Sequence, residues 1–132
     1  MSEGSILLVS NEFGIARALR LTLAAKGYEV TTVESPAEAV ELSESGKRDL
    51  VLLDCESSAA TLEACREIRA CSDVAIIVVS SDGSEDKRAR ASLAGADDYV
   101  LKPFGINEIT GSISANIHKS KTASRSRYTL VS

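Results

Sequence analysis

The stretch Leu50-Val51-Leu52-Leu53-Asp54 decides the fold, because four apolar residues run without a break into one carboxylate. An uninterrupted apolar run of this length is typical of a strand that is buried on both faces, as in a parallel sheet covered by helices. A carboxylate directly after such a strand lies at the carboxyl edge of the sheet, where open α/β sheets place their binding sites. Asp54 is therefore predicted to line a site.

Other apolar runs of the chain also end in polar residues. These are 6–9 before Ser10 and Asn11, 76–79 before Ser80, and 99–101 before Lys102. If the runs form parallel neighbouring strands, their ends meet at one edge of the sheet. A carboxylate, a hydroxyl and a lysine are then expected in one small site.

Amphipathic or well-capped helical segments alternate with the strands. The expected strands are 5–9, 28–33, 49–54, 74–80 and 98–101, and the expected helices are 13–26, 36–46, a segment ending near 71, 85–94 and 106–118. Ser35, Pro36 and Glu38 form a helix start with a capping box. Right-handed crossovers then predict an α/β fold, a doubly wound five-stranded parallel sheet of order 2-1-3-4-5 flanked by five helices.

Length and composition narrow the range of functions. The chain has 132 residues, a net charge of −4, no Trp and 4% aromatic residues. These values fit one globular domain and argue against nucleic-acid binding by charge or base stacking. The three cysteines lack CxxC spacing, so Cys55, Cys65 and Cys71 are interpreted as reduced thiols, with Cys65 in the core. His118 has no Cys or His nearby with which to form a metal site.

Residues 1–118 are expected to form the domain and 119–132 a polar, basic linker or tail, with a strand-like end at 128–131. The sequence has no signal peptide and no apolar run of membrane-spanning length. The cytoplasm is therefore the expected location, with no membrane association.

The residues expected at the strand ends suit phosphoryl transfer. Asp54 can act as a nucleophile, Lys102 can supply a positive charge to phosphoryl oxygens, and the Ser80 hydroxyl can donate a hydrogen bond. Mg²⁺ prefers oxygen ligands, which Asp54, the neutral Asn11 and Glu56 could provide. The same residues taken singly also fit a loop cap, a turn and an inert pocket.

Taken together, these strand ends and motifs resemble those of the response regulator receiver domain (CheY-like) of two-component systems, and the resemblance covers residues 5–118. The resemblance rests on three segments, namely 49–54, 76–80, and Ala94-Gly95-Ala96-Asp97-Asp98-Tyr99-Val100-Leu101-Lys102-Pro103-Phe104. Among receiver domains, the sequence is most similar in character to those of winged-helix (OmpR/PhoB-type) regulators.

The resemblance implies roles for individual residues. Asp54 matches the phosphoacceptor, Lys102 the lysine of the site, and Ser80 and Tyr99 the two switch residues. The Lys102–Pro103 bond is implied to be cis. A histidine kinase is the implied phosphodonor.

The resemblance also implies that residues 85–118 carry a face for homodimers or partners. The residues expected at that interface are Asp97, Asp98, Tyr99 and Ile109. DNA binding would need an output domain beyond this chain.

The chain departs from the family where two acidic residues are expected after the first strand, because Ser10-Asn11 stand there. Weak or absent Mg²⁺ binding is therefore expected at Asn11, Asp54 and Glu56. Two hypotheses follow: an atypical receiver that accepts a phosphoryl group on Asp54, or a phosphorylation-independent interaction and dimerisation module.

An enzymatic function is not expected beyond self-catalysed phosphotransfer and autodephosphorylation. An aspartate-nucleophile phosphatase would carry a second Asp where Glu56 stands. A flavin-binding protein of the same fold order would need a loop richer in Ser, Thr and Gly than residues 10–14.

Overall fold

The computed structural model describes residues 3–44, 47–54 and 58–131. Within them, strands and helices alternate along the chain. The elements are β1 (Gly4–Ser10), α1 (Phe13–Ala25), β2 (Tyr28–Val33), α2 (Pro36–Ser43), β3 (Leu50–Asp54), α3 (Ala59–Cys71), β4 (Ala75–Ser80), α4 (Glu85–Ala94), β5 (Asp98–Leu101) and α5 (Ile106–Val131). These bounds lie within a few residues of those expected up to β5.

The five strands form one parallel sheet in the order β2-β1-β3-β4-β5, which confirms the predicted fold. The order places β1 and β3 side by side in the middle of the sheet. Their register sets Ser10 opposite Asp54, and that of β4 and β5 sets Ser80 opposite Leu101. The carboxyl ends of neighbouring strands are therefore level at one edge.

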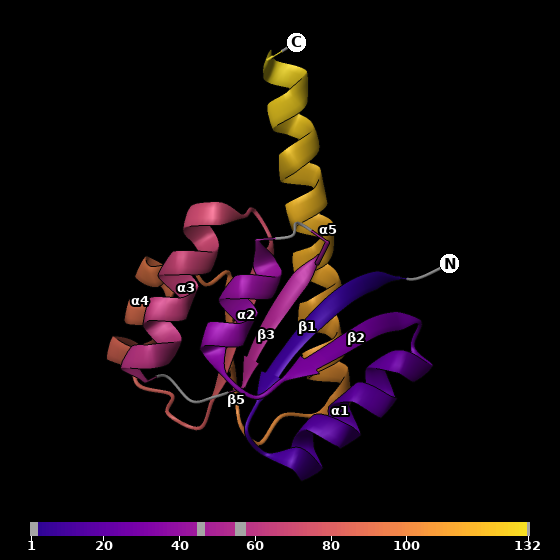
Figure 1. Cartoon of the computed structure of the whole chain (residues 1–132), viewed down its shortest axis with the longest axis vertical. Helices are drawn as coiled ribbons and strands as arrows, with labels where there is room; N and C mark the ends of the chain where they lie inside the picture. The colour runs from indigo at the N-terminus through magenta and orange to yellow at the C-terminus, as the bar shows by residue number, and fades with distance from the viewer. Residues whose placement is uncertain (1–2, 45–46, 55–57, 132) are drawn as a thin grey trace.

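Helices cover both faces of the sheet (Figure 1). Side chains of successive strand residues point to opposite faces, so the apolar runs supply two cores. One core joins the sheet to α1 and α5, and includes Ile6, Leu8, Leu19, Leu23, Leu50, Leu52, Ile77, Ile109 and Ile113. The other joins it to α2, α3 and α4, and includes Leu7, Val9, Ala39, Val51, Leu53, Leu62, Cys65, Ile68, Val78, Ala91 and Ala94.

Three helices begin at serine caps. Ser35 accepts a hydrogen bond from the backbone N–H of Glu38 and donates one to its carboxylate, which confirms the predicted capping box. Ser58 and Ser84 accept equivalent backbone bonds in α3 and α4. Each such cap satisfies an N–H group that the first turn of a helix leaves without an internal partner.

Most of the isoleucine side chains along α5 are buried. Ile109 and Ile113 are fully buried and Ile117 is nearly so, whereas Ile106 at the start of the helix is 44% exposed. Ile109 was expected at a partner interface, and that expectation is wrong. Its side chain packs between α5 and the sheet and does not reach the surface.

The helix α5 extends to Val131, beyond the end expected near residue 118. It projects past the sheet at the carboxyl terminus (Figure 1). The strand-like end expected at 128–131 is therefore helical. Residues 112–131 contain neither Gly nor Pro, so nothing in the local sequence breaks the helix. The division of the chain at 118 remains a prediction.

Among the described residues, no helix combines the length and the apolar character that crossing a bilayer would require.

Candidate functional site

Three strand ends bring the candidate site together at the carboxyl edge of the sheet. Asp54 is the last residue of β3, Ser10 is the last residue of β1, and Lys102 directly follows β5. The Asp54 side chain has no exposed surface, and that of Lys102 is 16% exposed. The site therefore consists of a buried carboxylate and a largely buried ammonium group.

Both oxygens of the Asp54 carboxylate have partners. Lys102 Nζ lies 2.5 Å from Oδ1, and Ser10 Oγ donates a hydrogen bond to Oδ2 at 3.3 Å. An ionised carboxylate in the protein interior needs such partners, because desolvation alone would strongly disfavour its charge. Lys102 thus lies beside Asp54 as the sequence predicted, and Ser10 stands where an acidic residue was expected.

Glu12 is a third charged group at this site. Its Oε1 lies 3.3 Å from Lys102 Nζ, and its backbone N–H donates to Ser10 Oγ at 3.2 Å. The pairing of Glu12 with Lys102 was not predicted from the sequence. The available signal was its position two residues beyond the end of β1, at the same edge of the sheet as Lys102.

The pKa values of the two paired groups both shift upward, for different reasons. Burial raises the pKa of Asp54 and outweighs the hydrogen bond and positive charge of Lys102, which lower it. Burial alone would lower the pKa of Lys102, but the hydrogen bond and charge of Asp54, followed by those of Glu12, raise it. Lys102 is therefore a fixed positive charge at any physiological pH.

The two expected switch residues, Ser80 and Tyr99, contact the same residue. The buried Ser80 Oγ accepts a hydrogen bond from the backbone N–H of Asp82 at 3.1 Å, and the Tyr99 hydroxyl donates to the backbone oxygen of Asp82 at 2.6 Å. The guanidinium of Arg88 lies over the Tyr99 ring, 5.3 Å from its centroid. Together these contacts hold the segment between β4 and α4.

The described residues offer few oxygen ligands for a divalent cation. Asn11 is exposed, and Glu56 lies outside the described residues. No group of three or more His, Cys, Asp or Glu residues is placed for metal binding in the described part of the chain. Asp54 and Glu12 are the carboxylates that the described residues bring to this site, and both contact the ammonium of Lys102. Mg²⁺ prefers several oxygen ligands, and here the ammonium of Lys102 lies between the two described carboxylates.

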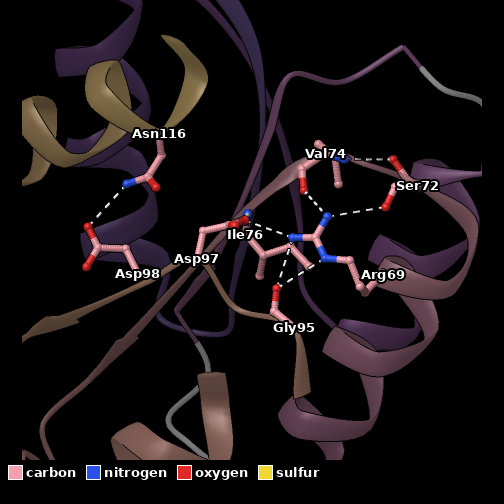
Figure 2. Close-up of polar contacts among 8 residues, drawn as sticks. All are labelled: Arg69, Ser72, Val74, Ile76, Gly95, Asp97, Asp98 and Asn116. Atoms are coloured by element: carbon pink, nitrogen blue, oxygen red, sulfur yellow. Dashed lines mark hydrogen bonds and ion pairs between the residues drawn. The ribbon is translucent and has the colours of Figure 1, made fainter. Parts of the chain in front are cut away.

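The acidic residues expected at a partner interface make contacts within the molecule. Asp97 Oδ2 pairs with Arg69 at 2.8 Å and accepts a hydrogen bond from the backbone N–H of Ile76. Asp98 Oδ2 accepts hydrogen bonds from Ser112 at 2.5 Å and from Asn116 at 3.2 Å. Both carboxylates therefore help to fix β5 to its neighbours (Figure 2).

Arg69 lies at the centre of the contacts drawn in Figure 2. Its guanidinium donates two hydrogen bonds to the oxygen of Gly95, one each to the oxygens of Ser72 and Val74, and one to Asp97. All five N–H groups of an arginine are thereby used. Arg69 joins the end of α3 to the start of β4 and the end of α4, a role that the sequence analysis did not predict.

Gly95 ends α4 in the left-handed conformation, with a φ of 117°. A Cβ atom at this position would lie 2.9 Å from the Cβ of Arg69. Glycine is therefore required both by the backbone angle and by the close approach of Arg69.

The peptide bond between Lys102 and Pro103 is cis, as the resemblance implied.

This is a doubly wound parallel sheet, a class of fold that binds its ligands at the carboxyl ends of the strands, and Asp54 and Lys102 lie at that edge. The sequence matches the response regulator receiver domain family over residues 6–114. The chain belongs to this family.

Curated relatives and solved structures agree with this assignment. The chain is 32% identical over 124 residues to the transcriptional regulatory protein ResD of Bacillus subtilis (strain 168), and the match covers 93% of this chain and 52% of that protein. It is 31% identical over 119 residues to the transcriptional regulatory protein KdpE of Mycobacterium tuberculosis, covering 89% of this chain and 53% of that protein. The chain spans about half the length of these relatives.

Two solved structures illustrate the match in fold. One is the receiver domain of sensor histidine kinase PA1611 from Pseudomonas aeruginosa PAO1, a structure with a magnesium ion coordinated in its active-site cleft. It superposes with a TM-score of 0.77 at 30% identity, and the match covers 87% of this chain and 98% of that one. A CheY-like receiver domain protein from Methanospirillum hungatei JF-1 gives a TM-score of 0.83 at 21% identity, covering 91% of this chain and 98% of that one.

Proposed function

We propose that this chain is an atypical receiver that accepts a phosphoryl group on Asp54 with weak or absent dependence on Mg²⁺. The observation that carries the proposal is the 2.5 Å pair of Asp54 and Lys102 at the carboxyl edge of the sheet. In the reaction, a carboxylate oxygen of Asp54 forms a bond to phosphorus while the bond from phosphorus to the leaving group breaks. Lys102 then stabilises the negative charge on the phosphoryl oxygens.

The phosphodonor in the cell is proposed to be a histidine kinase, which is the partner that membership of this family suggests. ResD and KdpE are named as transcriptional regulatory proteins and are about twice as long as this chain. By analogy, DNA would be reached only through an output domain outside these residues. A location in the cytoplasm is part of the same proposal.

Acetyl phosphate is expected to add one phosphoryl group to the chain, because its acetate leaves readily as phosphorus binds to Asp54. Intact-mass spectrometry measures the product. The Asp54→Ala variant is the control and should stay unmodified. An unmodified wild-type chain at saturating donor, with and without Mg²⁺, would exclude the phosphoacceptor function.

Placing two acidic residues at the end of β1 and directly after it is expected to strengthen Mg²⁺ binding, which we propose is weak or absent in the wild-type chain. The variant Ser10→Asp with Asn11→Asp adds two carboxylates to those of Asp54 and Glu12, which gives the oxygen-rich set that Mg²⁺ prefers. Titration calorimetry should detect the ion in this variant and detect little binding in the wild type. Equal binding by both chains would contradict the proposed loss of the metal site.

The alternative function is a phosphorylation-independent module for protein interaction or homodimerisation through α4, β5 and α5. It is favoured by the complete burial of the Asp54 side chain, whose two oxygens already have partners. Leu93 on α4 is 88% exposed, so this helix offers an apolar side chain for a contact with a partner.

Sedimentation analysis separates the two functions. A dimer that forms equally in the wild type and in Asp54→Asn, and that Leu93→Asp abolishes, would favour the module. A monomer in every case would favour the phosphoacceptor.

A further inference from the structure

Glu12 is connected to Asp54 by two separate routes. Its carboxylate contacts Lys102 Nζ, which pairs with Asp54 Oδ1. Its backbone N–H donates to Ser10 Oγ, which in turn donates to Asp54 Oδ2. The four residues thus form a closed ring of polar contacts around the acceptor carboxylate.

The local structure of α1 does not explain the position of the Glu12 side chain. Glu12 occupies the cap position before α1, but its side chain accepts no capping hydrogen bond from the helix. It reaches instead to Lys102, 90 positions along the chain. Although this side chain is 51% exposed, it lies against a lysine that is only 16% exposed. The direction of the Glu12 side chain is therefore set by its contact with Lys102.

Two carboxylates share a single ammonium group in this ring. Lys102 Nζ lies 2.5 Å from Asp54 and 3.3 Å from Glu12. An incoming phosphodonor carries negative charge, so it is attracted by Lys102 and repelled by Glu12. A carboxylate that takes up part of the lysine charge lowers the net attraction for the donor.

We propose that Glu12 is a positioning residue that restrains Lys102 and thereby limits the reactivity of Asp54 toward anionic phosphodonors. This inference rests on the proposed phosphoacceptor function. A phosphoryl group on Asp54 adds negative charge at the ring, which attracts Lys102 and repels Glu12. Because the Glu12 side chain is half exposed whereas that of Asp54 is buried, the contact of Lys102 with Glu12 is the weaker of the two and is the one that gives way.

The first test compares the rates at which acetyl phosphate modifies the wild-type chain and Glu12→Gln. The variant removes one negative charge near the donor and is expected to react about threefold faster. Glu41→Gln removes the same charge from an exposed position on α2 and should leave the rate unchanged. A contact with a purely structural role would make Glu12→Gln slower, so an equal or lower rate would overturn the proposal.

The second test does not depend on phosphorylation. Glu12→Gln is combined with Asp54→Asn, and unfolding by urea is measured for the four chains of the double-mutant cycle. In Asp54→Asn, Glu12 is the one carboxylate left against Lys102 among the described residues. Glu12→Gln should therefore lower the folding equilibrium constant at least threefold more in Asp54→Asn than in the wild type.

The two tests fail in different ways. Equal effects of Glu12→Gln in both backgrounds would overturn the positioning role, whatever the phosphorylation result. Coupling in the cycle, together with a wild-type chain that takes no phosphoryl group, would support the link from Glu12 to Lys102 and exclude the proposed phosphoacceptor function.

Discussion

Replacing Lys102 by methionine is expected to destabilise the folded chain by about 3 kcal/mol at neutral pH. The ammonium is the cation paired with the Asp54 carboxylate, whose side chain has no exposed surface. Methionine fills a similar volume but leaves a buried negative charge with only the Ser10 hydroxyl as its other described partner. Urea unfolding measures the loss, and the same variant is expected to react far more slowly with acetyl phosphate.

The loss of stability should shrink as the pH falls. Burial already raises the pKa of Asp54, and removing the ammonium raises it further. A carboxyl group whose pKa is raised by folding binds more protons in the folded state than in the unfolded state. The stability of the variant relative to the wild type therefore improves as the pH falls toward the unfolded-state pKa, and it worsens as the pH rises. Unfolding at neutral pH and at about pH 5 checks this sign.

Two controls accompany this prediction. Lys26→Met removes an exposed lysine at the end of α1 and should change stability by less than about 0.5 kcal/mol. Adding Asp54→Asn to Lys102→Met removes the buried charge and should recover most of the loss. If the double variant is as unstable as Lys102→Met alone, the uncompensated carboxylate is not the cause.

Replacing Arg69 by methionine is expected to destabilise the chain by about 3 kcal/mol. The substitution removes five hydrogen bonds and leaves partly buried backbone oxygens of Gly95 and Val74 without their guanidinium partner. It also leaves Asp97 with the backbone N–H of Ile76 but without its cation. Chemical denaturation measures the loss, and hydrogen exchange should show earlier opening at the end of α4.

The same helix offers a matched control. Arg66 pairs with Glu63 on the surface of α3, where both side chains are more than half exposed. Arg66→Met should therefore cost less than about 0.5 kcal/mol. Arg69→Lys keeps the charge but not the planar fork, and should recover only a small part of the stability. Equal losses for Arg66→Met and Arg69→Met would show that the Arg69 contacts contribute little.

Local patterns were sufficient to predict most of the fold. The apolar run that ends at Asp54 and its counterpart at 76–79 predicted buried strands, and both lie in the centre of the sheet. The capping box at Ser35 is a contact between close neighbours, so short-range sequence determines it. The exception is α5, where the change to polar residues after 118 suggested an end that the helix does not have.

The candidate site was predicted only in part. The sequence placed Asp54 and Lys102 at the same edge, because strand order fixes which strand ends are neighbours. It did not predict that Glu12 contacts Lys102, or that Asp97 pairs with Arg69. Ile109 was expected at a partner interface but lies in the core, because its side chain packs between α5 and the sheet.

The sequence by itself determined that Leu50 to Asp54 forms a buried strand with a carboxylate at its end, because burial and periodicity are properties of neighbouring residues. The sequence also placed Lys102 at the same edge of the sheet, but tertiary structure alone decided the full set of contacts that satisfies the carboxylate. The ammonium of Lys102 reaches Asp54 from just after β5, the hydroxyl of Ser10 reaches it from the end of β1, and Glu12 completes the ring. Such contacts depend on side-chain directions across distant segments, and a linear pattern of residue types does not encode those directions.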